Sequence, residues 1–86
     1  MSKEKSITAW AVGDKVTVHI PRSGDVPAIV RDVKIEGLVQ KVRLRTAVHA
    51  PLLGKYIVSN DQRWFDGDSL KVRVSCIPEL GEEQED

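Results

Sequence analysis

The chain has 86 residues, of which 41% are hydrophobic and 30% charged, with 13 basic and 13 acidic side chains. This length allows one domain and no more, and no segment approaches the ~18 consecutive apolar residues that a membrane helix requires. Cys76 is the single cysteine. It excludes an internal disulfide and, because no apolar secretory signal follows the first residues, we expect a cytoplasmic protein.

The net charge of zero hides an uneven distribution along the chain. The last eight positions hold five acidic residues and no basic one, and without these five the body keeps 13 basic and 8 acidic residues, a formal charge of +5. Such an acidic stretch is typical of a solvated tail. We therefore expect a flexible N-terminal segment over residues 1–9, a folded domain over residues 10–78, and a disordered acidic tail over residues 79–86 that is dispensable for folding.

Alternating apolar and polar residues dominate from residue 12 to residue 76, a pattern that predicts β-strands rather than helices. The expected strands span residues 15–20, 28–36, 38–48, 55–58, 63–65 and 70–74. The residues expected to face the core are Val16, Val18 and Ile20 in the first strand, Ile29, Val33 and Ile35 in the second, and Leu38, Val42, Leu44 and Val48 in the third. Turn signals recur about every ten residues, a rhythm typical of small barrels and sandwiches.

Two short segments resemble the SH3-like β-barrels. Residues 12–18, Val-Gly-Asp-Lys-Val-Thr-Val, look like the first strand of such a barrel, and residues 64–72, Trp-Phe-Asp-Gly-Asp-Ser-Leu-Lys-Val, look like its penultimate strand, one-turn 3₁₀ segment and closing strand. The resemblance covers roughly residues 12–74 and implies an all-β fold of about five strands, without implying a function. The acidic, tyrosine-rich first loop of the peptide-binding SH3 domains is missing, so we do not expect binding of proline-rich peptides.

Residues that carry catalysis or bind metals are sparse. A nucleophilic site would need Cys76 or a serine beside His19 or His49, whereas His19 is expected to face solvent and His49 to lie in the loop before Pro51. One cysteine and two histidines match no structural zinc pattern, and the dispersed glycines form no phosphate-binding loop. We therefore expect a non-catalytic protein without a metal or a cofactor.

The basic residues of the strands suggest one possible partner, a nucleic acid. Residues that alternate on one face of a strand lie about 6.6 Å apart, and such rows can contact successive phosphates if their strands are adjacent. Trp64, Phe65 and Tyr56 would add a stacking surface for bases. The same alternation is also what an ordinary solvated face looks like. The candidate residues for this alternative are Lys41, Arg43, Arg45, Lys71 and Arg73.

The aromatic residues suggest a different partner, another protein chain. Trp64 and Phe65 are adjacent, so on a strand they face opposite sides and one of them is expected to be exposed. An exposed aromatic beside Arg63 is common in protein interfaces, and Tyr56 is the further candidate. The leading hypothesis is therefore a small interaction module that binds a protein partner or self-associates through its barrel edges and the Trp64–Phe65 hairpin, with nucleic-acid binding as the alternative.

Overall fold

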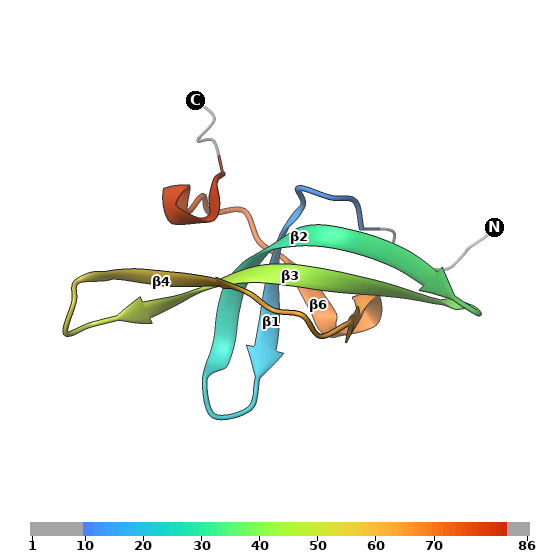
Figure 1. Cartoon of the computed structure of the whole chain (residues 1–86), viewed down its shortest axis with the longest axis horizontal. Coiled ribbons are helices and arrows are strands. Elements are labelled where there is room, and N and C mark those ends of the chain that lie inside the picture. Colours follow the sequence, from blue (N-terminus) through green and yellow to red (C-terminus); the bar gives the residue numbers. More distant parts are fainter. Residues whose placement is uncertain (1–9, 83–86) are drawn as a thin grey trace.

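The computed structural model describes residues 10–82, and it forms a small antiparallel β-domain (Figure 1). This confirms the predicted all-β class; residues 1–9 and 83–86 lie outside the described part. Between residues 10 and 82 no helix is long and apolar enough to cross a membrane. The elements are β1 (Lys15–Ile20), β2 (Gly24–Glu36), β3 (Val39–Ala50), β4 (Lys55–Asn60), β5 (Phe65–Asp66), the 3₁₀ segment η1 (Gly67–Ser69), β6 (Leu70–Val72) and the 3₁₀ segment η2 (Pro78–Leu80).

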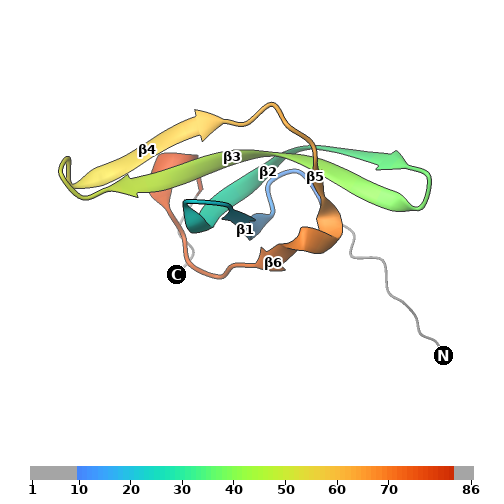
Figure 2. The ribbon, with the colours of Figure 1, turned by 90° about the horizontal axis from the view of Figure 1, so that it is seen from below.

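The strands form one sheet in the order β4-β3-β2-β1-β6, and the short β5 also pairs with β3. The last pair between β2 and β3 joins Ala28 to Thr46, whereas β3 continues to Ala50 alongside β4 alone. The β3–β4 hairpin therefore projects from the body as a two-stranded ribbon, at the opposite end of β3 from the β2–β3 turn (Figures 1 and 2). We call residues 47–58 the arm.

The strand β2 begins at Gly24, four residues before the predicted start, although Pro27 lies within it. Backbone groups of alternate residues point to the same side of a strand, and the N–H of Val30 donates to the carbonyl oxygen of Asp14 next to β1. Pro27 is an odd number of residues from Val30, so its nitrogen points away from β1. The missing N–H therefore costs no bond of the β1–β2 ladder, which is the condition under which a strand accepts proline.

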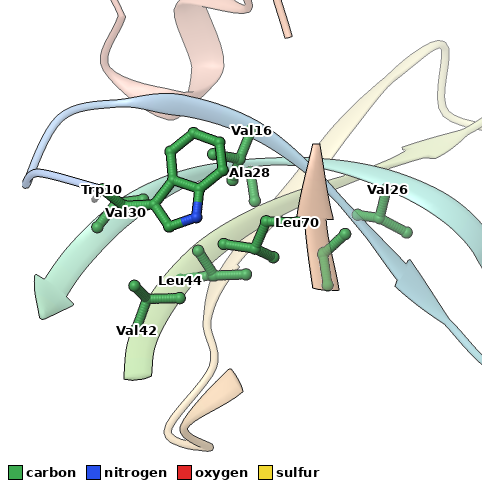
Figure 3. Close-up of a cluster of buried hydrophobic side chains, with 9 residues drawn as sticks. Trp10, Val16, Val26, Ala28, Val30, Val42, Leu44 and Leu70 are labelled. Carbon is green, nitrogen blue, oxygen red and sulfur yellow. The ribbon is translucent and has the colours of Figure 1, made fainter. Parts of the chain in front are cut away.

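One face of the sheet, the core face, carries the main hydrophobic core (Figure 3). Trp10 closes one end of this core, because its indole N–H donates to the carbonyl oxygen of Gly67 at 2.8 Å. The side-chain amide of Gln40 holds Trp10 in place by bonding both its backbone N–H and its carbonyl oxygen, at 2.8 and 2.9 Å. The buried residues of the main core are Trp10, Val16, Val18, Val26, Ala28, Val30, Val42, Leu44 and Leu70.

A β-bulge in β2 changes which of its residues face this core. The β2–β3 register shifts between Val30 and Asp32, so Arg31 is an extra residue on β2. An extra residue reverses the parity of alternation. Val33, after the bulge, is on the core side opposite Val42, but Ile29, before it, is on the opposite side. The prediction that Ile29 faces the main core is therefore wrong, and a strict two-residue period could not reveal the reversal.

Several residues predicted in the core are exposed because β2 and β3 run past it. Val33 and Ile35 lie toward the β2–β3 turn, Leu38 lies in the turn itself with 89% of its surface exposed, and Val48 lies on the arm. In the middle of β3, by contrast, Leu44 is fully buried as predicted. Alternation fixes the face of a residue, whereas its burial depends on whether a second layer covers that part of the strand.

The opposite face of the sheet, the outer face, is covered in part by the chain's own C-terminal segment. We call residues 74–82 the strap. Ile77 and Leu80 of the strap form a second buried cluster with Ala47, and Tyr56 and Val58 of the arm pack against it. The arm therefore rests on a segment about thirty residues further along the chain rather than on the main core.

A buried ion pair anchors the strap. Glu82 and Arg73 are joined at 2.5 Å, with only 3% and 7% of their side chains exposed, and Glu82 also accepts the N–H of Ile77 at 2.8 Å. The predicted disordered tail from residue 79 is therefore wrong for residues 79–82, while residues 83–86 lie outside the described part. A run of acidic residues predicts solvation only when no buried cation is available to pair with one of them.

Candidate protein-binding surface

Trp64 lies on the outer face against two cations. The Lys34 ammonium is 4.2 Å from the centroid of its ring, and the Arg43 guanidinium is 4.7 Å away. The register explains the contact, since Val42 is opposite Phe65 and the preceding Trp64 therefore lies beside Arg43. Such cation–π contacts each contribute about 0.5–1 kcal/mol at exposed sites. The indole that was predicted to contact a partner is thus already engaged within the chain.

The other predicted partner-binding residues are engaged as well. Phe65 packs against the main core, and the Arg63 guanidinium lies 5.1 Å from its ring while pairing with Asp61 at 2.7 Å. Side-chain hydrogen bonds in that pair lower the pKa of Asp61 and raise that of Arg63. Tyr56 is on the arm, at the other end of β3 from Trp64. The four residues therefore do not form one surface.

The basic row of β3 lies on the outer face, as predicted, but carboxylates neutralise most of it. Arg43 pairs with Asp32 at 2.7 Å, and Lys41 pairs with Asp66, a hydrogen bond that raises the pKa of Lys41. A polyanion would have to displace these carboxylates before it could reach the cations. Arg45, further along the row, makes no ion pair with any residue between 10 and 82.

The basic residues of the last strand do not join this row. Two strands, β2 and β1, separate β3 from β6. Lys71 is exposed on β6, whereas the side chain of Arg73 is buried and donates hydrogen bonds to Glu82 and to the carbonyl oxygens of Val16 and Ala28. The five candidate cations therefore form no continuous patch, because β3 and β6 are not adjacent, and adjacency was the condition for a merged patch. Binding of a nucleic acid stays a prediction.

The arm carries a set of exposed apolar side chains. Leu52 is fully exposed at its tip and Leu53 is 60% exposed beside it. Val48 and Ile57 are directly opposite each other across the two strands, and both are more than two-fifths exposed. The β2–β3 hairpin also exposes large apolar residues, among them Ile35 and Leu38. Where such residues form a contiguous patch, they mark sites of interaction.

The turn at the tip of the arm has a defined conformation. The N–H groups of Leu53 and Gly54 both donate to the carbonyl oxygen of Ala50, at 3.0 and 2.9 Å. Pro51 restricts the start of the turn, and Gly54 ends it with a φ of 67°, a left-handed conformation that glycine adopts without strain. Nothing in this turn requires leucine at positions 52 and 53, so the hairpin itself does not account for their apolar character.

A shallow groove of about 320 Å³ lies at the base of the arm. It is lined by residues of the β1–β2 hairpin and of the arm, beyond the last β2–β3 pair. Its walls combine apolar side chains with polar groups. Its lining includes Asp25, Val26 and Pro27 from β2, and Val48, His49 and Tyr56 from the arm.

The titratable groups near the groove form simple surface contacts. His19 Nδ1 lies 3.1 Å from Asp25 Oδ1, with both side chains 70% exposed. His49 lies in β3 rather than in the predicted loop, and its ring meets that of Tyr56 edge-on at 5.2 Å. Within residues 10–82, no group of three His, Cys, Asp or Glu side chains is placed to hold a metal ion. These contacts orient the side chains of His19 and His49.

Comparisons with models of protein families, with curated proteins and with solved structures gave no significant match. Function must therefore be inferred from the geometry of this chain. The sequence pattern does not predict the arm as a binding surface, because Pro51 and Gly54 indicate only a turn. The signal that could have found it is the pair of leucines between them, since turn positions normally hold small or polar residues.

Proposed function

We propose that this chain is a small non-catalytic interaction module of the SH3-like barrel type, which binds a protein chain through its arm. The observation that carries the proposal is the exposed apolar ribbon formed by Val48, Leu52, Leu53 and Ile57, which ends in a structured turn and adjoins a groove. Fold resemblance alone would support no function. The surface proposed here differs from the Trp64–Phe65 hairpin, whose side chains have partners within the chain.

Flexible loops lose conformational entropy when they bind, and a surface that is already ordered loses less. The hydrogen-bonded turn from Ala50 to Gly54 holds the two leucines in place before any partner arrives. Burying a leucine side chain contributes about 1.5–3 kcal/mol, and Val48 and Ile57 nearer the base of the arm add further apolar surface that a partner can bury.

The test is photo-crosslinking from a single position in living cells that make the protein. A benzophenone-bearing amino acid replaces Leu52 in one variant and Leu38 in the control, because Leu38 is a similarly exposed leucine in the turn at the other end of β3. We expect a discrete protein adduct from position 52 and none, or a different one, from position 38. No adduct from position 52, or the same adducts from both positions, would contradict the proposal.

A further inference from the structure

We propose that the arm binds an extended peptide segment of another protein, which adds to the sheet as a further strand along β4 and has an apolar centre between acidic ends. This inference rests on the proposed function and names the conformation and chemistry of the partner. The strand β4 is at the end of the order β4-β3-β2-β1-β6, and Figure 2 shows it at the margin of the molecule. Among residues 10–82 only β3 pairs with it, so its other edge is open to a strand from a partner.

The register shows which backbone groups of β4 point to this open edge. The N–H of Asp61, the residue after β4, donates to the carbonyl oxygen of Leu44, so the even-numbered residues of β3 direct their backbone groups toward β4. Their partners in β4 are the odd-numbered residues. The N–H and carbonyl groups of Tyr56, Val58 and Asn60 therefore point away from β3. Within residues 10–82 these groups have no backbone partner, and an added strand would supply one for each.

The two edges of the sheet differ in the features that discourage further pairing. The edge strand β6 has three residues with Lys71 at its centre, and short, charged edges resist an additional strand. The strand β4 has six residues, and from Tyr56 to Asn60 it contains no charged side chain and no proline. Its pairing with β3 is regular from end to end, without the bulge that would twist an edge away. These differences favour β4 as the edge that receives a partner.

The side chains beside the open edge explain the apolar centre of the partner. On one face, Ile57 is 51% exposed and lies opposite Val48. On the other face, the half-buried Tyr56 and Val58 rest on the strap. Side chains of a strand alternate between the two faces, and adjacent strands lie about 4.8 Å apart. Successive apolar residues of an added strand would therefore contact Ile57 on one side and Tyr56 or Val58 on the other.

Cations at both ends of β4 explain the acidic ends of the partner. Lys55 is exposed at the start of the strand, and Arg45 lies directly opposite Asn60 at its end. Neither cation has an ion pair with another residue in the range 10–82. Arg45 is roughly 10 Å from the path of an added strand, a distance that an arginine and a glutamate side chain bridge together. Acidic residues at both ends would fix the register of the added strand.

The test uses a twelve-residue peptide selected from random sequences by phage display on the full chain. We expect the selected peptides to have an apolar centre and an acidic residue toward each end. Hydrogen exchange measured by NMR reports where they bind. In the free chain the amides of Tyr56, Val58 and Asn60 should exchange at least about tenfold faster than that of Ile57, which bonds β3, and saturating peptide should slow them at least about tenfold.

Two N-methylated versions of the same peptide test the strand conformation. One version is methylated on the odd-numbered central amides and the other on the even-numbered ones, so the two have the same composition. In an added strand, alternate amides bond β4 and the others point to solvent. One version should therefore bind at least about tenfold more weakly than the parent peptide, and the other should change by less than about threefold. This comparison requires no change in the protein.

Substitutions in the protein test the same edge from the other side. Val58→Pro removes an N–H that points to the open edge and leaves the bonds to β3 in place, so peptide affinity should fall at least about tenfold. Circular dichroism checks that this variant keeps its fold. Lys55→Glu and Arg45→Glu should each weaken binding several-fold. The matched control Lys71→Glu, on the opposite edge strand, should bind like the native chain.

Several outcomes overturn the inference. They are the selection of no peptide, peptide binding that leaves exchange of the β4 amides unchanged, equal binding by the two methylated versions, and a loss from Lys71→Glu as large as that from Lys55→Glu. Slow exchange of these amides in the chain without peptide also overturns it, because the edge would then be covered by a second copy or by the chain itself. If any of these occurs while position 52 still crosslinks to a protein, the inference alone fails and the proposed function stands.

Discussion

Near the β2–β3 end of β3, the cations Lys34 and Arg43 each contact a carboxylate and an aromatic ring. At the β3–β4 end, apolar side chains are exposed to solvent. Lys34 pairs with Glu36 and Arg43 with Asp32, and both cations lie against Trp64. The arm instead presents leucine, valine and isoleucine. Apolar side chains are exposed at the first end as well, among them Ile35 and Leu38, so the two ends differ in their cation contacts and not in apolar exposure alone.

The two ends also differ in what supports them. The β2–β3 end is close to the main core through Val42 and Phe65. The arm has the strap beneath it, and the strap is held by the ion pair between Arg73 and Glu82. A long strand can therefore pass from one core to another, and each part of it is buried or exposed according to the layer that covers it.

The largest loss of stability is expected when the ion pair that anchors the strap is removed. Glu82→Ala leaves the buried guanidinium of Arg73 without its counter-charge, which should lower the free energy of unfolding by about 3–5 kcal/mol. The control is Glu79→Ala, an exposed acid three residues earlier in the strap, which should change it by less than about 0.5 kcal/mol. Urea unfolding measures both. Equal effects of the two substitutions would mean that the strap is not anchored through Glu82.

The next largest losses of stability are expected at the centre of β3, where Leu44 faces the core and Arg43 faces the opposite side. Leu44→Ala removes a fully buried side chain and should cost about 2–5 kcal/mol. Arg43→Ala removes the ion pair with Asp32 and one cation above Trp64, which should cost about 1 kcal/mol, more than alternation alone predicts for a solvated residue. Thermal unfolding compares the two. A greater loss from Arg43→Ala would mean that the strand is turned over.

Smaller changes in stability are expected from one substitution at each end of β3. Trp64→Ala should cost about 1–2 kcal/mol, because both cations lose the ring that they contact. Leu52→Ala should leave the stability of the isolated chain within about 0.5 kcal/mol, because Leu52 is fully exposed. Chemical unfolding at low protein concentration, where self-association does not contribute, measures each. A large loss from Leu52→Ala under these conditions would show that the tip packs within its own chain.

The smallest loss of stability is expected when the charge of Asp61 is removed, and this loss should depend on pH. Arg63 lowers the pKa of Asp61 in the folded chain, so this pair stabilises the fold above the unfolded pKa of about 3.9, and the contribution is lost as the pH falls through the lower, folded pKa. Asp61→Asn should therefore cost about 0.5–1 kcal/mol at pH 7. The difference from the native chain should vanish in acid. Unfolding measured from neutral pH to pH about 3 tests this, and a difference that stays constant would show that charge is not the cause.

Much of the fold could be predicted because local patterns determine it. The first strand, Lys15–Ile20, was predicted with its correct bounds, since its alternation is regular and turns flank it on both sides. The bulge at Arg31 could not be predicted, because an extra residue leaves the composition of β2 unchanged. The strap could not be predicted either. Its anchor pairs Glu82 with Arg73 beneath the surface, and the sequence shows only an acid among other acids.

The candidate surface was harder to predict than the fold. Alternation placed Lys41 and Arg43 on the outer face correctly, but it says nothing of Asp32 and Asp66, which come from other strands to pair with them. The arm depends on β3 extending beyond its last pair with β2, and this length is set by where β2 bends toward β1. Such a property belongs to the pairing of three strands, so no single segment of the sequence contains it.

The contacts that close the two ends of the domain have a consequence for the speed of folding. The indole of Trp10 bonds a residue 57 positions away, and the guanidinium of Arg73 bonds the carbonyl oxygen of Val16 across the same separation. Small domains dominated by such distant contacts fold in milliseconds to seconds rather than microseconds. No hairpin of this chain contains either contact, so we expect the fluorescence change of Trp10 to accompany the rate-limiting step instead of preceding it.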